Sequence, residues 1–271
     1  GDTVMKPLVS IIITNYNYAG FLSEAIESAL TQDYPHCEVL VLDDGSSDES
    51  LEVACRYPVK VLAQKNGGLS LARNNALVHA RGEYVLFLDA DDRLPEHAII
   101  QLADSLGSAT NDVAYAYGQM QYFDLQTDVF KSREFDAKQL FKSNYVCATT
   151  LLRKEVLVRA GGYDNGFRTL REDWELYIRL WRLGYKGIFI QQITLECRKH
   201  KPHVRRSLAV KALSMAKLIY LYPSFFWKQW LRHPLRYTYY MIVGKVWNST
   251  RDYGDKAELH GLRVVKDIKD R

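Results

Sequence analysis

Residues 83–92 read EYVLFLDADD: a short apolar run that stops at three carboxylates, those of Asp89, Asp91 and Asp92. The run is rich in Val, Leu and aromatic residues and does not alternate with polar ones, which is typical of a central strand buried on both faces. The three aspartates then lie at the C-terminal end of that strand, where open α/β sheets bind their ligands. This stretch therefore predicts an α/β sheet with an acidic site at its edge.

An acidic site of this kind suits a metal ion. Carboxylates packed this closely repel one another unless a cation or another positive group offsets their charge. Mg²⁺ and Mn²⁺ prefer oxygen ligands, often from one or two carboxylates together with the phosphates of a substrate. The alternative is a solvated acidic turn that binds nothing, so the rest of the chain has to decide between the two.

The first ninety residues predict repeated βαβ units. Apolar runs alternate with segments whose apolar residues recur at helical spacing, which favours a mostly parallel, Rossmann-like sheet flanked by helices. We expect strands at 9–14, 38–42, 59–63 and 84–89, and helices at 21–30, about 48–56 and 69–80. The strand at 38–42 also ends on carboxylates, Asp43 and Asp44. Because parallel strands end at the same edge, the two acidic ends can share one crevice.

The second half of the chain predicts a more mixed order. We expect helices at 95–106, 154–160, 173–183 and 206–221, and strands at 113–117, 119–123, 146–152, 186–190 and 194–197. Gly118 is expected to form a bulge between two of these strands. After Pro223 the pattern is aromatic and basic, and it predicts no definite element.

Charge divides the chain near residue 201. The 271 residues are 47% hydrophobic, enough for a real core, and the formal net charge is only +4. Residues 201–251 nevertheless hold ten Lys or Arg and no Asp or Glu, so the remainder is net acidic. We therefore expect an α/β domain over residues 1–200 and a basic, aromatic, mainly helical C-terminal extension over 201–271.

Cysteine usage and hydropathy indicate a cytoplasmic protein. The four cysteines form no CxxC pair, and most lie in apolar surroundings, as reduced core thiols do. The N-terminus lacks the apolar core of a signal peptide, because 8–14 is an expected strand. No window reaches the roughly 18 apolar residues of a membrane-spanning helix.

Further polar residues are candidates for a site, each with a plainer explanation. Glu172 and Asp173 open an amphipathic helix, where acidic residues also favour the helix dipole and stay ionised. Arg73 can contact a phosphate or a base, or merely cover a helix surface. His200 and His203 follow the last expected strand, where a histidine is either structural or a metal ligand.

Six segments, taken in order, resemble the successive motifs of family 2 glycosyltransferases with a GT-A fold. They are residues 9–17, 39–48, 67–76, 84–92, 160–164 and 172–176. The ordered series carries the resemblance, since a lone Asp-x-Asp means little. It covers about 8–200 and fades beyond Lys201.

The resemblance implies a nucleotide-diphosphate sugar donor and inversion at the anomeric carbon. Thr14 and Tyr16 match positions that line the nucleobase, with the tyrosine ring as a stacking face. Asp44 matches the carboxylate that accepts from the N–H of a pyrimidine ring. Arg73 matches a base or phosphate contact, and Asp89 opens the Asp-x-Asp signature.

The resemblance also implies a metal ligand and a catalytic base. Asp91 is the expected direct ligand of Mn²⁺ or Mg²⁺. His200 resembles the histidine of a late Arg-x-His element near the diphosphate, with His203 as a competing candidate. Asp173 matches the base that takes the proton of the acceptor hydroxyl. Glu172 and Trp174 are expected at the acceptor pocket.

The function so implied is metal-dependent, inverting transfer of a sugar from a UDP- or dTDP-sugar. Its expected setting is bacterial surface polysaccharide or glycan synthesis, with a glycan, lipid-linked or protein-linked acceptor. One alternative is a catalytically inactive nucleotide- or carbohydrate-binding module, which should lose Asp91 or Asp173. Another is a sugar nucleotidyltransferase, which should carry a Gly-rich basic loop where residues 15–20 read NYNYAG.

The basic, aromatic C-terminal extension is compatible with two interpretations. Basic residues are drawn to anionic lipid headgroups, and Trp and Tyr settle at the membrane interface, so the extension can contact the inner face of a membrane. Alternatively, its aromatic residues pack as helices against the first domain. Nucleic acid is not an expected partner, because no recognised motif accompanies the basic residues.

Overall fold

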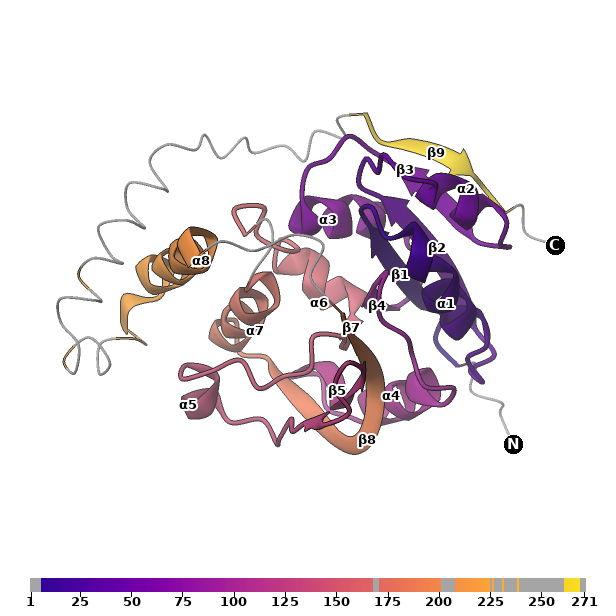
Figure 1. The fold of residues 1–271 in the computed structure, drawn as a ribbon. Coiled ribbons are helices and arrows are strands. Elements are labelled where there is room, and N and C mark those ends of the chain that lie inside the picture. The colour runs from indigo at the N-terminus through magenta and orange to yellow at the C-terminus, as the bar shows by residue number, and fades with distance from the viewer. Residues whose placement is uncertain are drawn as a thin grey trace, which may run out of the picture.

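The computed structural model describes residues 6–167, 171–200, 208–224, 226, 231, 238 and 261–268. Its centre is one large mixed sheet with the strand order β6-β5-β7-β4-β1-β2-β3-β9, and β8 pairs with β5 outside this path. Helices flank the sheet (Figure 1). The architecture is thus the expected α/β fold.

The parallel half of the sheet forms as the sequence predicts. Its elements are β1 (Val9–Asn15), α1 (Ala19–Leu30), β2 (Cys37–Asp43), α2 (Ser50–Cys55), β3 (Lys60–Ala63), α3 (Leu69–His79) and β4 (Tyr84–Asp89). β4, β1, β2 and β3 are parallel neighbours in that order. Every residue of β1 is buried, which explains its unbroken apolar run.

The register of these strands fixes the edge at which a site can form. Thr14 lies opposite Asp89 across β1 and β4, and Asn15 lies opposite Asp43 across β1 and β2. The acidic ends of β2 and β4 therefore flank the end of β1 on both sides, as parallel pairing predicts.

The second half of the sheet is built from fewer, longer strands than expected. Its elements are α4 (Ala98–Gly107), β5 (Val113–Asp124), β6 (Val129–Phe130), α5 (Ala137–Leu140), β7 (Leu151–Arg153), α6 (Lys154–Arg159), α7 (Glu172–Arg182) and β8 (Lys186–Lys199). The expected pairs of strands at 113–123 and 186–197 are each one continuous strand. The two pair in parallel, with register irregularities on both sides of Gly118.

The strand expected at 146–152 is wrong for most of its length, since only β7 joins the sheet, antiparallel to β4. Residues 146 and 147 instead pack against α7. Val146 and Cys147 are buried, and the hydroxyl of Tyr177 donates to the carbonyl of Cys147 at 3.3 Å. The apolar character that suggested a strand therefore serves contacts with a helix.

The C-terminal part returns to the sheet. After helix α8 (Leu208–Leu221), strand β9 (Arg263–Lys266) pairs antiparallel with β3, which the sequence did not predict. Figure 1 shows α8 beside α7 and β9 at the opposite end of the molecule. His203 and most of the basic residues of the extension lie outside the described residues, so its mainly helical character is observed only in α8.

Within the described part of the chain, no helix combines the length and the apolarity needed to cross a membrane. Two aromatic residues of the extension, Tyr222 and Phe226, are buried. The ring of Phe226 lies 6.4 Å from that of Trp174 on α7. The burial of these two aromatic residues agrees with the second interpretation of the extension, in which its aromatic residues pack against the first domain.

Candidate active site

Four polar side chains meet at the C-terminal end of β4. One carboxylate oxygen each from Asp89, Asp91 and Asp92 lie within 4.8 Å of one another. His200, at the end of β8, places its Nε2 2.8 Å from Oδ2 of Asp91. The structure thus joins the acidic strand end to the late histidine, which lies 109 residues further along the chain.

The electrostatics of this cluster suit a cation. Burial raises the pKa of Asp91, and the charge of Asp89 raises it further, while the contact with His200 acts in the opposite direction. Burial also raises the pKa of Asp92, with repulsion from its two acidic neighbours adding to the effect. Carboxylate oxygens and an imidazole nitrogen are ligands that Mn²⁺ and Mg²⁺ accept, so this donor set fits a divalent cation.

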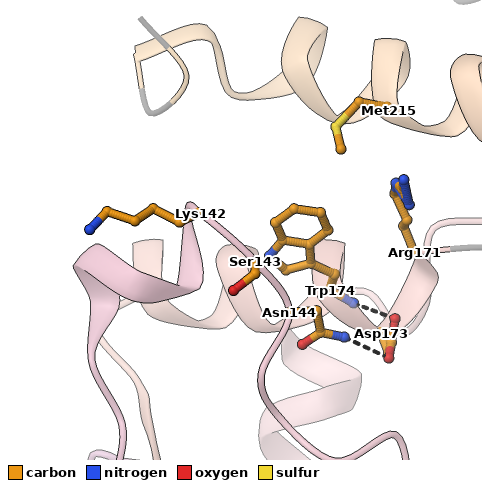
Figure 2. Close-up of a pocket in the computed structure, with 7 residues that line it drawn as sticks. All are labelled: Lys142, Ser143, Asn144, Arg171, Asp173, Trp174 and Met215. Carbon is orange, nitrogen blue, oxygen red and sulfur yellow. Dashed lines mark hydrogen bonds between the residues drawn. The ribbon is translucent and has the colours of Figure 1, made fainter. Parts of the chain in front are cut away.

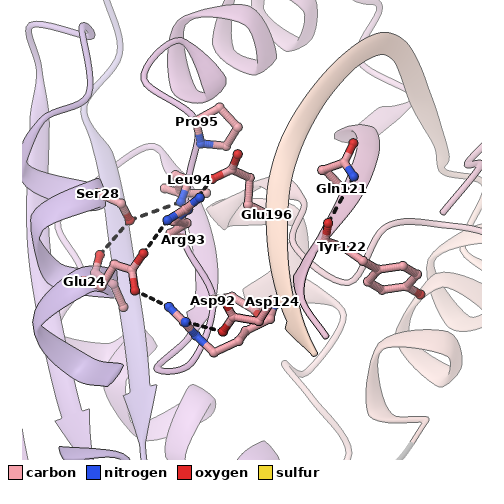
Figure 3. Close-up of polar contacts among 12 residues, drawn as sticks. Glu24, Ser28, Asp92, Arg93, Leu94, Pro95, Gln121, Tyr122, Asp124 and Glu196 are labelled. Carbon is pink, nitrogen blue, oxygen red and sulfur yellow. Dashed lines mark hydrogen bonds and ion pairs between the residues drawn. The ribbon is translucent and has the colours of Figure 1, made fainter. Parts of the chain in front are cut away.

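Two arginines hold the loop that carries Asp91 and Asp92. Arg198 donates from its backbone N–H to Oδ1 of Asp92 at 2.9 Å, and from Nε to the carbonyl of Asp91 at 3.0 Å. Arg93 and Arg198 both form ion pairs with Glu24 of α1, and Figure 3 shows the contact between Arg93 and Glu24. The acidic loop is therefore tied to both α1 and β8.

Arg73 of α3 links the acidic cluster to the start of α7. Its Nη2 lies 3.0 Å from Asp89, and its Nη1 lies 3.2 Å from Glu172. Burial alone would lower the pKa of Arg73, but Tyr163, Asp89 and Glu172 outweigh that effect and raise it. The guanidinium therefore remains charged inside the protein, so Arg73 does more than cover a helix surface.

Asp173, on the first turn of α7, is held by two hydrogen bonds. Its Oδ2 accepts from Nδ2 of Asn144 at 2.9 Å, and its Oδ1 accepts from the backbone N–H of Trp174 at 2.7 Å. Burial nevertheless raises the pKa of Asp173. The expectation that the helix start favours the ionised form is therefore outweighed here, because desolvation disfavours the charge more strongly than these donors favour it.

The neighbouring Glu172 has the more strongly shifted carboxyl group. Burial, followed by the charge of Asp173, raises the pKa of Glu172 to about 7. Its Oε1 accepts from Arg73, whereas its buried Oε2 has no hydrogen-bond partner. The carboxyl group of Glu172 can thus be either neutral or ionised near neutral pH.

A pocket of about 380 Å³ opens beside Asp173. Figure 2 shows the residues that line it, from the loop after α5, the start of α7 and the middle of α8: Lys142, Ser143, Asn144, Arg171, Asp173, Trp174 and Met215. Trp174 is thus in the wall of this pocket. Glu172 is not, because its carboxylate is turned toward Arg73.

The residues expected around a nucleobase lie at the ends of β1 and β2. Tyr16 is exposed, whereas Thr14 is buried and its hydroxyl has no hydrogen-bond partner. Asp44 is buried, which raises its pKa. It accepts from Gln64 at 2.7 Å and from the backbone N–H groups of Gly67 and Gly68 at 2.8 and 2.9 Å. The Asp44 carboxylate thus holds the loop before α3 and keeps at most one lone pair for another donor.

Sequence reasoning missed two kinds of residue. Asn144, which orients Asp173, lies in a region without a recognisable pattern, so no signal could have found it. Arg198 stands in the CRKH segment at 197–200, and only its histidine was assigned a role. The spacing of Arg198 to His200 was the available signal.

Comparison with known proteins agrees with this geometry. The family model described as glycosyl transferase family 2 matches residues 10–174. Glycosyltransferase GlyA of Streptococcus pneumoniae is 26% identical over 226 residues, which are 79% of this chain but 30% of GlyA. TuaG of Bacillus subtilis, a glycosyltransferase named for teichuronic acid biosynthesis, is 38% identical over 97 residues, which are 34% of this chain and 38% of TuaG. The chain thus spans well under half the length of both relatives.

Solved structures share the fold. TarS of S. aureus, in complex with UDP-GlcNAc, matches with a TM-score of 0.67 at 20% identity, over 81% of this chain and 66% of that one. The mannosyltransferase PcManGT of Pyrobaculum calidifontis, in complex with GDP-Man and Mn²⁺, matches with a TM-score of 0.61 at 18% identity, over 92% of this chain and 77% of that one. Both are glycosyltransferases with the GT-A fold. With a family model that covers more than half of its length and this fold, the chain belongs to glycosyl transferase family 2.

Proposed function

We propose that this protein is an inverting glycosyltransferase that requires Mn²⁺ or Mg²⁺ and moves a sugar from a UDP- or dTDP-sugar to an acceptor hydroxyl. One observation carries the proposal. Asp173, with a raised pKa, faces a pocket of about 380 Å³. Arg73 connects the neighbouring Glu172 to Asp89 of the acidic cluster. The candidate base is therefore next in the chain to Glu172, which Arg73 connects to the candidate diphosphate site.

Asp173 is the proposed general base. It takes the proton of the acceptor hydroxyl while that oxygen attacks the anomeric carbon from the face opposite the nucleotide, so a single displacement inverts the configuration. The raised pKa makes the carboxylate a stronger base than an exposed aspartate, and the bonds from Asn144 and Trp174 fix its orientation.

Asp91 and His200 are the proposed metal ligands, with Asp89 and Asp92 beside them. When bound, the ion neutralises the charge that develops on the leaving diphosphate. Asp89 also pairs with Arg73, whose permanent charge can stabilise the same phosphates. The donor set of this chain supports the assignment, and so does the Mn²⁺ named for PcManGT.

Tyr16, Thr14 and Asp44 are proposed to hold the nucleobase. An exposed tyrosine ring offers a stacking face, and Thr14 lies two residues before it, near the end of β1. UDP-GlcNAc in TarS supports a uridine donor. GDP-Man in PcManGT shows that the fold also accommodates a purine, so selectivity for the base needs a direct test.

The biological setting proposed is bacterial polysaccharide or glycan synthesis, which the relatives named for it support. The glycosyltransferase domain is proposed to span residues 1–200, with Met215 of the extension completing the pocket beside Asp173. The basic extension of 201–271 is proposed to lie near the inner face of the membrane. Lys228, Arg232 and Arg236, outside the described residues, are the proposed contacts with anionic lipid. Cosedimentation with anionic liposomes at low and high salt tests this, and no binding at low salt contradicts it.

A donor screen tests the proposed activity. The protein is incubated with UDP-, dTDP- and GDP-sugars plus Mn²⁺, and the nucleotide released by slow hydrolysis is measured. We expect release from a uridine or thymidine donor, loss of release with a chelator, and weaker binding of CDP than of UDP. Asp91→Asn should abolish metal-dependent UDP binding in calorimetry. A protein that binds a nucleotide or a carbohydrate but releases no nucleotide from any donor would instead be the inactive binding module.

A further inference from the structure

The pocket beside Asp173 is unevenly charged. Of its seven lining residues, Lys142 and Arg171 are cations and Asp173 is the single carboxylate. In Figure 2 the two cations lie on either side of Trp174, with Asp173 below the indole and Met215 above it. Beside Asp173 a ligand thus meets Arg171 and an apolar wall, while Lys142 adds a second positive charge on the other side of Trp174, with its side chain directed away from Asp173 (Figure 2).

The backbone of Arg171 has an unusual conformation. Arg171 precedes α7 and has φ 66°, in the left-handed region that few residues other than glycine adopt. Its guanidinium lies 5.8 Å from the ring centre of Trp174. Backbone conformations of this kind cost free energy and cluster at functional sites. The conformation of Arg171 is therefore consistent with a functional role for its side chain.

Lys142 supplies the second charge from a different element. It follows α5, and its side chain is exposed. In the described part of the chain it forms no ion pair, so no carboxylate there compensates its ammonium group. Asp173 does not compensate it either, since the oxygens of Asp173 accept from Asn144 and from the backbone of Trp174.

We propose that the acceptor is an acidic saccharide, whose phosphate or carboxylate group is bound by Arg171, while Lys142, on the other side of Trp174, adds positive charge to the same pocket. The inference rests on the proposed function, because it places that anion beside the hydroxyl that Asp173 deprotonates. The planar fork of Arg171 matches a phosphate or a carboxylate with two parallel hydrogen bonds, and Lys142 adds a mobile point charge. Binding the anion also orients the acceptor, which brings its hydroxyl to the base.

Three sugars with the same ring test the charge preference: glucose 6-phosphate, glucuronic acid and glucose. Each is titrated by saturation-transfer NMR into protein saturated with UDP and Mg²⁺, so that the donor phosphate site is already filled. We expect at least about threefold tighter binding of one or both acidic sugars than of glucose, weakened by added salt. The two acidic sugars distinguish a phosphate from a carboxylate. Equal binding of all three, or no binding of either acidic sugar, overturns the proposal.

Substitutions of the two cations test whether they cause the preference for acidic sugars. Arg171→Gly removes the guanidinium at a position whose backbone glycine adopts readily, and Lys142→Gln removes the other charge. Each should lower the preference for acidic sugars about threefold and leave UDP affinity unchanged. Lys138→Gln, an exposed lysine of α5 outside the pocket, should change neither. A preference retained in both pocket variants, with UDP affinity intact, overturns the assignment.

The donor side is measured separately. UDP binding with Mg²⁺ is determined before the sugars are added. Absence of UDP binding contradicts the proposed function, while titrations of the sugars into the protein without UDP still test the charged pocket. The two failures are therefore distinguishable.

Discussion

Asp173 is the residue on which the proposed chemistry depends most directly. Asp173→Asn keeps the shape of the side chain but removes its capacity to accept a proton. We expect transfer to fall roughly 100-fold or more, because this is the usual contribution of a general base. Affinity for UDP with metal should remain, since Asp173 lies in the pocket and not in the acidic cluster.

Steady-state kinetics and calorimetry on the same preparation separate the two effects. Transfer by Asp173→Asn at near the wild-type rate would assign the base elsewhere. Loss of UDP affinity together with transfer would indicate a structural defect instead.

The raised pKa of Glu172 predicts how the stability of the fold depends on pH. Its pKa rises from 4.5 to about 7 on folding, so the folded protein holds this proton more tightly than the unfolded chain. The stability due to Glu172 is therefore fully present below about pH 4.5 and is lost as pH rises through about 7. Glu172→Gln cannot titrate, so the wild type should lose on the order of 3 kcal/mol relative to the variant across this interval.

Urea denaturation of both proteins at a series of pH values measures this difference. Comparison with Glu172→Gln cancels the titration of all other groups to first order. A difference that stays constant with pH would show that the carboxyl group of Glu172 titrates normally.

At the scale of residues, sequence motifs locate side chains but not their partners. Asp89, Asp91 and Asp173 are found because each stands at the end or start of a recognisable element. The bonds of Asp44 to Gly67 and Gly68 depend on how the loop before α3 folds back, more than twenty residues later in the chain. Such contacts follow from tertiary packing, which spacing does not encode.

At the scale of elements, the acidic loop after β4 depends on β8. Arg198 contacts the carbonyl of Asp91 at 3.0 Å and Asp124 of β5 at 2.6 Å, and it also pairs with Glu24 of α1. It lies between the rings of Phe21 and Phe123. This network holds three elements around the cluster that is proposed to bind metal, which makes Arg198 a positioning residue.

Arg198→Lys tests that role. Lysine keeps the charge but loses the fork, so the loop should be held less firmly. We expect the metal concentration that half-saturates UDP binding to rise roughly tenfold, as for other residues that support metal ligands. UDP binding without metal should not change. Arg159→Lys, at an exposed residue of α6, is the matched control. An unchanged metal requirement in Arg198→Lys would contradict the role.

The elements that the sequence predicted well are those whose packing is uniform along their length. β1 and β4 are buried between helices, so an unbroken apolar run identifies them. β8 was divided in two because residues 191–193 at its middle are exposed, although the strand continues through them. β9 is short, mostly exposed and charged, so only its pairing with β3 identifies it.

At the scale of the whole molecule, the candidate active site combines segments that the charge pattern assigned to different parts. The pocket takes Met215 from α8, beyond the predicted boundary at residue 201. Lys217 of α8, which is buried, pairs with Asp164 at 2.8 Å, just before the segment that leads to α7. A charge boundary reflects which side chains are solvated, and it carries no information about which helix faces pack.

A buried hydrogen bond helps to attach α8 to α7, and deleting a single oxygen atom removes it. The hydroxyl of Tyr222 donates to Oε1 of Glu175, which also pairs with Arg179. Tyr222→Phe deletes this donor and leaves a buried carboxylate with one partner fewer, a change that costs about 1–3 kcal/mol. Because the bond lies between the two helices, the loss should loosen α8 before it affects the sheet.

Hydrogen exchange measured by mass spectrometry can follow this loosening. In Tyr222→Phe, amides of 208–221 should exchange faster, while those of β1 and β2 keep their protection. Tyr57→Phe is the matched control, because Tyr57 donates to Glu27 at 2.7 Å on the side of α1 and α2, away from the pocket. Equal acceleration in helix and sheet would mean that α8 unfolds only with the whole domain. Since Met215 lines the pocket, an α8 that opens by itself would also let the size of the proposed acceptor pocket vary while the proposed donor side stays rigid.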